Sequence, residues 1–114
     1  MSYTMFLDDL RLAENHYPND PEMVTVRTFH EAVDYIEEHG LPSFISFDHD
    51  LGDTNTDVEL TGYSLAKYII DYMFENEITE PFQYFIHSAN PIGEANIRAY
   101  LENGFKAVRE HWSD

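Results

Sequence analysis

FISFDHDLG, residues 44–52, is the stretch of sequence that decides the fold. Its first four residues are mostly aromatic or β-branched, which is typical of a strand inside a sheet. The run ends directly in Asp48, His49 and Asp50, whose side chains are not buried without a partner or a metal ion. Open α/β sheets bind their ligands beyond the carboxyl ends of the strands. We therefore expect a buried strand that ends in a functional site.

The rest of the chain alternates strand-like apolar runs with amphipathic helical patterns. Thr28 and Glu31 have the spacing of a capping box, which indicates a helix start, and Gly40 ends that helix. Gly104 is expected to end the last helix at about residue 103, so that residues 105–109 form either an edge strand or a docked tail. The predicted strands are 4–7, 23–28, 44–47 and 82–86, and the predicted helices are 29–39, 62–77 and 91–103, with at most one helical turn near 10–13.

This alternation predicts an α/β fold with a mainly parallel sheet, because strands separated by helices form right-handed parallel crossovers. The element lengths fit a flavodoxin-like three-layer sandwich with strand order 2-1-3-4 and a reduced first helix. A chain of 114 residues without a low-complexity linker fits a single domain over residues 1–114.

The chain is strongly acidic, with 22 Asp and Glu against 6 Lys and Arg and a formal net charge of -16. Such a field repels polyphosphate, so duplex nucleic acid is not an expected partner. A divalent cation or a small metal-chelated nucleotide is compatible with it. The sequence shows no signal peptide and no membrane-spanning run, so we expect no membrane partner and a cytoplasmic location. It has no cysteine, and it leaves homo-oligomerisation open.

Carboxylates follow two of the predicted strands, Asp8 and Asp9 after 4–7 and Asp48 and Asp50 after 44–47. The order 2-1-3-4 makes these strands neighbours. Four carboxylates at one edge repel one another unless a cation lies among them, so we expect a metal site with all four as ligands. Oxygen ligands favour Mg²⁺ or Mn²⁺. For Asp9 and Asp50, the alternative is a solvated loop acid.

Two histidines stand at predicted strand ends, His49 after the third strand and His87 after the fourth. Imidazole changes its charge near neutral pH, so each is a candidate general acid or base. Direct metal ligation by either one would favour Mn²⁺, Fe²⁺ or Zn²⁺. For His49, an imidazolium paired with its neighbouring acids is a further interpretation. The other four histidines have no comparable setting.

The start of the last predicted helix is a candidate phosphate site, because unpaired N–H groups and the helix dipole favour an anion there. Ser88, Asn90, Gly93 and Asn96 belong to this segment. The alternative for Asn90 is simple helix capping. Arg11 follows the paired acids, where it either contacts phosphate or pairs with a carboxylate.

Four segments of the chain form an ordered set of motifs. They are Leu7-Asp8-Asp9 with Arg11, Phe47-Asp48-His49-Asp50-Leu51-Gly52, Thr61-Gly62, and His87-Ser88-Ala89-Asn90-Pro91 with Gly93, Asn96 and Ile97. This set resembles the cyclic-phosphate processing receiver-like family. The resemblance implies a receiver-type α/β sandwich and a role in binding or hydrolysing cyclic nucleotides or cyclic phosphate ends.

The site is also similar to that of two-component receivers. In those proteins paired acids after the first strand bind Mg²⁺, and an aspartate after the third strand accepts phosphate. Asp8 and Asp9 match the pair, and Asp48 matches the acceptor. His87 with Ser88 stands near the usual Ser or Thr position, and no lysine follows a fifth strand. These departures weaken a phosphorelay role and favour acid–base chemistry.

Our hypothesis is a metal-dependent phosphoesterase or binding protein that acts on cyclic nucleotides or cyclic phosphate ends. Asp8, Asp9, Asp48 and Asp50 would hold the metal, and His49 and His87 would transfer protons, with Asp48 at the reacting centre. The alternatives are a non-catalytic cyclic-nucleotide sponge or sensor, a signalling receiver phosphorylated on Asp48, a haloacid dehalogenase-type phosphatase, and an acidic mimic of nucleic acid.

Overall fold

The computed structural model describes residues 3–8, 11–48, 62–87 and 91–112. Its centre is a parallel sheet with the order β2-β1-β3-β4, which confirms the predicted order. β2 is shorter than the predicted 23–28, and the other strands lie within one residue of their predicted bounds. The strands are β1 (Thr4–Leu7), β2 (Val24–Val26), β3 (Phe44–Phe47) and β4 (Gln83–Ile86).

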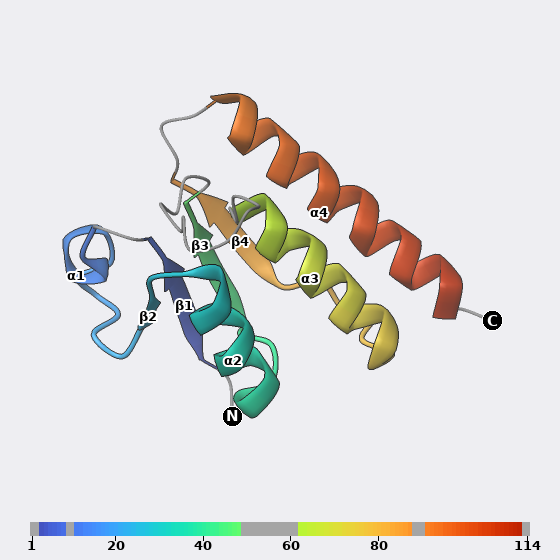
Figure 1. The fold of residues 1–114 in the computed structure, drawn as a ribbon, viewed down its shortest axis with the longest axis horizontal. Helices are drawn as coiled ribbons and strands as arrows, with labels where there is room; N and C mark the ends of the chain where they lie inside the picture. The colour runs from blue at the N-terminus through green and yellow to red at the C-terminus, as the bar shows by residue number, and fades with distance from the viewer. Residues whose placement is uncertain (1–2, 9–10, 49–61, 88–90, 113–114) are drawn as a thin grey trace.

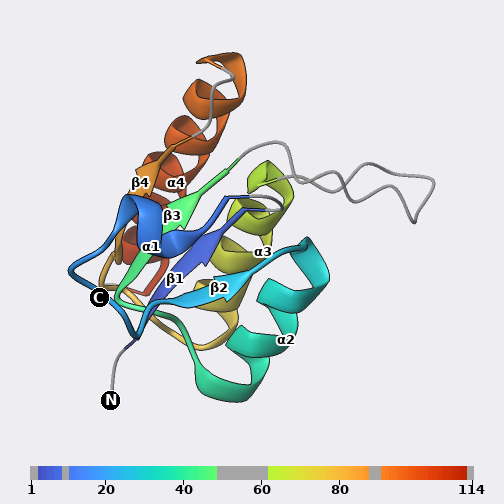
Figure 2. The same ribbon diagram turned by 90° about the vertical axis from the view of Figure 1, so that its left-hand side faces the viewer.

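Three long helices cover one face of the sheet, and one short helix lies on the other (Figures 1 and 2). Right-handed crossovers account for the sides of α1, α2 and α3, because the connection from β1 to β2 runs in the opposite direction from those that lead to β3 and β4. α4 follows β4 and packs against α3 on the same face. The fold is therefore the predicted receiver-like, flavodoxin-like α/β architecture with a reduced first helix. The helices are α1 (Ala13–His16), α2 (Phe29–His39), α3 (Gly62–Glu75) and α4 (Pro91–Trp112).

Alternate strand residues face the three long helices and form the main core. Met5, Leu7, Ile45 and Phe47 have no exposed surface, and they pack with the apolar faces of α2, α3 and α4. The predicted capping box also forms in part, because the Glu31 N–H donates to Thr28 Oγ1 at 3.1 Å. Burial of these alternate residues fixes the register, since a slip by one residue would turn them to the other face.

α4 does not end near residue 103 but continues to Trp112, so both interpretations of residues 105–109 are wrong. Gly104 is a packing residue. A Cβ atom placed there would lie 2.5 Å from Ile70 Cδ1 and 2.6 Å from Ile70 Cγ1, so the missing side chain allows α4 to approach α3 closely. Phe105 and Val108 are buried and continue the helical period of Ile97 and Leu101.

The face that carries α1 is thinly covered. Segment 11–23 lies over β1, where Tyr17 and His16 contact the ring of Phe6. Over β4 no described segment covers the same face, and Phe85 is 55% exposed. No helix in the described part of the chain is both long enough and apolar enough to cross a membrane.

Candidate functional site

Three of the predicted site residues converge at one edge of the sheet. Asp8, Asp48 and His87 are the first residues after β1, β3 and β4, respectively. Their backbone N–H groups continue the sheet pairing, since they donate to the carbonyls of Val26 (3.1 Å), Leu7 (2.9 Å) and Phe47 (2.9 Å), in that order. The sheet therefore anchors the backbone of each of the three residues to the neighbouring strand.

The side chains of these three residues also point the same way. Alternation along each strand places Asp8 on the face of Phe6, Asp48 on the face of Ser46, and His87 on the face of Phe85. Phe6 pairs with Ser46, and Ser46 pairs with Phe85, in the register of the sheet. One potential ligand atom from each of Asp8, Asp48 and His87 lies within 4.8 Å of the other two. We call these three residues the acid–histidine cluster.

Asp8 is the most buried member of the cluster, with 1% of its surface exposed. Its Oδ1 accepts the backbone N–H of Arg11 at 2.8 Å, and its Oδ2 accepts the Arg11 guanidinium at 3.2 Å. Arg27 donates to the carbonyls of Asp8 and Arg11 at 3.1 Å and 2.6 Å. Both arginines therefore hold the chain in place where it leaves β1.

His87 completes a chain of hydrogen bonds that fixes its tautomer. The Tyr17 hydroxyl donates to Ser46 Oγ at 2.9 Å, so the single Ser46 hydroxyl proton is available for His87 Nδ1, 2.7 Å away. His87 Nδ1 is then an acceptor, and Nε2 carries the proton toward Asp8 Oδ2 at 2.9 Å. The Phe6 ring stacks on the imidazole with centroids 4.8 Å apart and planes within 4°.

The neutral form of His87 is favoured at neutral pH. Burial lowers the pKa of His87 below its ordinary value of 6.5, and this effect outweighs Asp8 and Asp48, which act to raise the pKa. A neutral imidazole between a hydroxyl and a carboxylate can both donate and accept a proton. The chemistry open to this group is therefore proton transfer or metal ligation.

The donor set of the acid–histidine cluster suits a divalent cation. Two ionised carboxylates this close repel each other, and a cation between them would offset that repulsion. The two carboxylates offer oxygen ligands, which suit Mg²⁺ or Mn²⁺. His87 Nε2 could join them only by losing the proton that it donates to Asp8, and such a nitrogen ligand would favour Mn²⁺. Within the described residues, no other group of three or more carboxylate or imidazole side chains comes close enough to share an ion.

Of the remaining predicted site residues, three lie in the described part of the chain and the others lie outside it. Gly93 is buried in the first turn of α4, whereas Asn96 is exposed and its side chain makes no hydrogen bond within the described part of the chain. Arg11 pairs with Asp8, as one of its two interpretations required. The predicted metal ligands Asp9 and Asp50, the predicted catalytic His49, and the predicted phosphate-binding Ser88 and Asn90 lie outside the described residues.

Sequence reasoning missed the residues that hold His87. Ser46 is fully buried, and it is the only polar residue in the run 44–47. A lone hydroxyl inside an apolar strand, two residues before Asp48, indicates a hydrogen-bonding role on the same face. No comparable signal marks Tyr17 or His16, because they reach the site from a turn-rich segment whose path depends on the tertiary fold.

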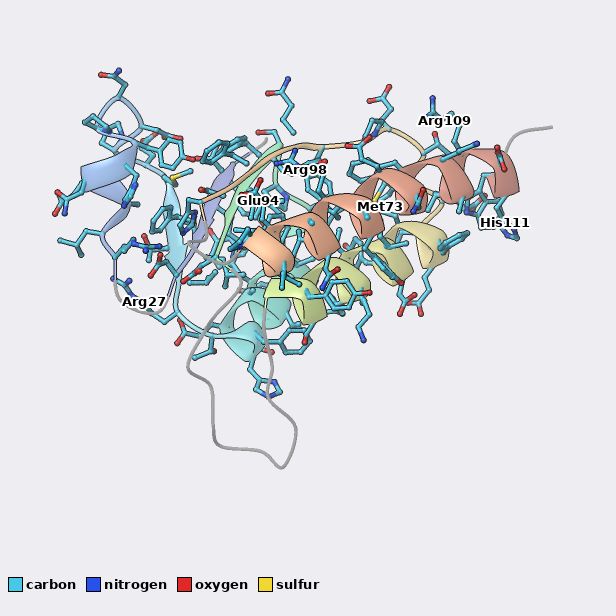
Figure 3. The ribbon with its side chains drawn as sticks, turned by 90° about the horizontal axis from the view of Figure 1, so that it is seen from above. Arg27, Met73, Glu94, Arg98, Arg109 and His111 are labelled. Atoms are coloured by element: carbon cyan, nitrogen blue, oxygen red, sulfur yellow. The ribbon has the colours of Figure 1, made fainter. Side chains whose placement is uncertain are left out.

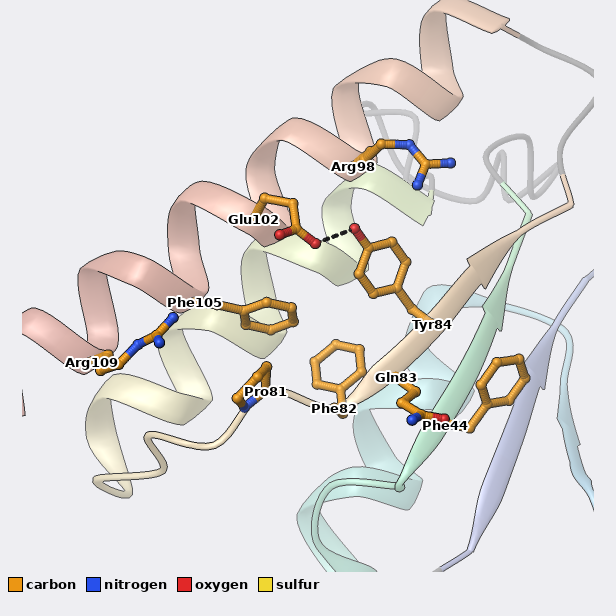
Figure 4. A pocket seen from close by; sticks show the side chains of 9 residues that line it. All are labelled: Phe44, Pro81, Phe82, Gln83, Tyr84, Arg98, Glu102, Phe105 and Arg109. Atoms are coloured by element: carbon orange, nitrogen blue, oxygen red, sulfur yellow. Dashed lines mark hydrogen bonds between the residues drawn. The ribbon is translucent and has the colours of Figure 1, made fainter.

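A hollow lies between β4 and α4 (Figure 4). It has a volume of about 500 Å³, and Arg98 and Arg109 line it together with Phe82 and Phe105. Tyr84 donates to Glu102 across it at 2.6 Å. Arg98 also pairs with Glu94 along α4 (Figure 3). This groove contains no member of the acid–histidine cluster, so it is a separate feature.

Comparisons with known proteins agree with this architecture. The family described as the cyclic-phosphate processing receiver domain matches residues 3–103. A solved structure described as a trimeric coiled coil of yeast Spc42 fused to another structure is 16% identical, with a TM-score of 0.57. That alignment covers 97% of this chain and 80% of the other, and at this identity it shows the fold alone. No curated protein matches the chain.

Proposed function

Because the chain belongs to the cyclic-phosphate processing receiver family, we propose that it binds cyclic nucleotides or cyclic phosphate ends and hydrolyses them in a metal-dependent reaction. The observation that carries this proposal is the convergence of Asp8, Asp48 and His87 within 4.8 Å at the carboxyl edge of the sheet. Metal-dependent hydrolysis of a phosphodiester uses carboxylates to bind the metal ion and a group such as imidazole to transfer protons, and both kinds of group lie close together here.

Asp8 and Asp48 would hold the cation, with Asp9 and Asp50 as the further ligands that the sequence predicts. Mn²⁺ or Mg²⁺ is the expected ion, because the ligands in this proposal are carboxylate oxygens. A bound divalent ion supplies a Lewis acid for the phosphoryl oxygen and lowers the pKa of a bound water. In an acidic chain, such an ion also lets an anionic ligand approach.

His87 would transfer the proton from Nε2, which would exchange its acceptor, Asp8 Oδ2, for an oxygen of the ligand, and His49 is the predicted second acid or base. Ser46 and Asp8 fix the ring from both nitrogens, so the imidazole keeps one orientation. The Nε2 proton points toward the carboxylate, which would stabilise an imidazolium formed during the reaction. Phosphate oxygens would be held by Arg11, Ser88, Asn90, Gly93 and Asn96.

The test is hydrolysis of a panel of cyclic mononucleotides, cyclic oligonucleotides and 2′,3′-cyclic ends with Mn²⁺ or Mg²⁺. Asp48→Asn should reduce both Mn²⁺ affinity and turnover. His87→Gln should reduce turnover by about 10²- to 10⁴-fold and leave Mn²⁺ affinity nearly unchanged, since the imidazole transfers a proton in this proposal. The matched control is Ser43→Ala, because Ser43 is exposed and immediately precedes β3, at the end of the strand away from the acid–histidine cluster.

Two outcomes would replace this proposal. Tight binding of a cyclic nucleotide without any turnover would make the protein a sponge or sensor. Modification of Asp48 by acetyl phosphate, without cyclic-nucleotide binding, would make it a phospho-accepting receiver, because Asp48 follows β3 beside Asp8 as a phosphoacceptor would. Absence of all three activities would refute the entire assignment of the site.

A further inference from the structure

An aromatic pocket adjoins the acid–histidine cluster on the thinly covered face of the sheet. It has a volume of about 430 Å³, within the range of small-molecule sites. His87 belongs to both the pocket and the cluster. The residues that line the pocket are His16, Tyr17, Phe44, Phe85 and His87, all with aromatic or imidazole rings.

The sheet itself forms the floor of this pocket. Phe44 and Phe85 occupy the same face as Ser46 and His87, because strand residues alternate between faces. Tyr17 packs edge-on against Phe44 with ring centroids 5.7 Å apart, which makes one wall. His16 extends that wall toward His87, and the centroids of the two rings are 5.8 Å apart.

The floor of the pocket is open because no long helix covers this side of β4 in the described chain. Phe85 is 55% exposed, although it stands in the middle of a strand. A large apolar ring in this position adds nothing to the core, since the main core lies on the opposite face. Phe85 forms one apolar surface with the rings of Phe44 and Tyr17, and a contiguous apolar surface, unlike a single exposed residue, marks an interaction site.

We infer that the aromatic pocket binds the base of a nucleotide whose phosphate lies at the acid–histidine cluster. The inference rests on the proposed function and narrows its substrate class from any cyclic phosphate to one that carries an aromatic base. Flat rings with little polar character stack on bases of every kind, and the exposed imidazole of His16 can supply a hydrogen bond at the edge of the pocket. His87 joins the two halves of the site.

A second copy of the chain is the main competing occupant, and its charge opposes it. Each copy carries a formal net charge of -16, so apposing two copies brings like charges together. A nucleotide has no such cost once a cation is bound at the cluster. The charge pattern therefore favours the small ligand.

The test compares two aromatic residues that are adjacent on β4 but lie on opposite faces. Phe85→Leu removes a ring from the aromatic pocket, and Tyr84→Leu removes one from the groove beside α4 (Figure 4). Leucine keeps the apolar surface, so Phe85→Leu removes only stacking, whereas Tyr84→Leu also removes the hydrogen bond to Glu102. The ligands are a 2′,3′-cyclic nucleotide and ribose cyclic phosphate without a base, each titrated with Mn²⁺ by calorimetry.

We expect Phe85→Leu to weaken cyclic-nucleotide binding about tenfold, equivalent to about 1.4 kcal/mol, relative to its effect on the base-free phosphate. Tyr84→Leu should affect the two ligands equally. A second measurement uses the double variant Phe85→Trp with Trp112→Phe, which moves the only tryptophan of the chain into the pocket. Its emission should be quenched by the nucleotide and not by the base-free phosphate.

Three results would overturn the inference. If the base-free phosphate binds as tightly as the nucleotide and Phe85→Leu changes neither, the proposed function stands and the base pocket is wrong. If neither ligand binds the wild-type protein, the proposed function fails and the pocket assignment fails with it. If sedimentation shows a dimer that Phe85→Leu dissociates, a second copy is the occupant.

Discussion

Replacing Ser46 with alanine tests whether the hydrogen-bond chain positions His87. The Ser46 hydroxyl is fully buried and makes two hydrogen bonds, to Tyr17 and His87. Each is worth about 1 kcal/mol net, so Ser46→Ala should lower the free energy of unfolding by about 2 kcal/mol. For 114 residues, with an unfolding entropy of about 2.1 cal/mol/K per residue, this loss lowers the melting temperature by about 8 °C.

The same change has a readout that general destabilisation would not produce. In the wild-type protein, His87 should be a single neutral tautomer with its proton on Nε2, visible in the ¹⁵N chemical shifts of the ring. Without the Ser46 hydroxyl, Nδ1 loses its donor, so Ser46→Ala should give a mixture of tautomers or a turned ring. In a double-mutant cycle with Tyr17→Phe, the two changes should couple by about 1 kcal/mol, because they share one hydrogen bond.

Ser43→Ala is the matched control. Ser43 is also a serine next to β3, but it is exposed and donates to the Tyr3 carbonyl at a longer distance of 3.3 Å, so its loss should change stability by less than about 0.5 kcal/mol. Equal stabilities for the two alanine variants, together with an unchanged His87 ring spectrum in Ser46→Ala, would refute the positioning role.

Three further predictions concern Gly104, Thr28 and His87. Gly104→Ala should lower the melting temperature by a few degrees, because crowding against Ile70, about 1–3 kcal/mol, exceeds the helix propensity gained, about 1 kcal/mol; a rise would contradict the packing role. Thr28→Ala should cost about 1 kcal/mol in urea unfolding, because α2 loses its N-cap. With a chelator present, stability should fall as the pH drops below about 6.5, because burial lowers the pKa of His87 and the unfolded state then binds more protons. His87→Gln should weaken that pH dependence, and an NMR titration of His87 with a pKa above 6.5 would contradict it.

The sheet could be predicted from the sequence because its signals are local. Each apolar run has a length typical of a strand, and the crossover rule leaves few possible orders. The meeting of Asp8 and Asp48 follows from that order, since β1 and β3 are neighbours. The roles assigned to Asp9, His49 and Asp50, and to Ser88 and Asn90, remain predictions.

The features that the sequence did not reveal depend on packing between segments that are far apart in the sequence. Gly104 is read as a helix stop when only the neighbouring residues are considered, but it lies against Ile70 in α3, which no local pattern reveals. Similarly, Tyr17 reaches Ser46 across 29 positions of sequence. The pairing of Arg11 with Asp8, at a separation of only three residues, was within reach of sequence reasoning.

The open face of the sheet explains why the acid–histidine cluster and the aromatic pocket occur together. The alternation that brings Asp8, Asp48 and His87 to one side must also bring Phe44 and Phe85 to that side, because the three strands are parallel and in register. A long helix across this face would bury Phe85 and fill the pocket, leaving only the rim for a ligand. With α1 reduced to four residues, the strands present a polar end and an aromatic floor on one continuous surface. Shifting β4 by one residue would exchange Phe85 and His87 for Tyr84 and Ile86, and both features would be lost at once.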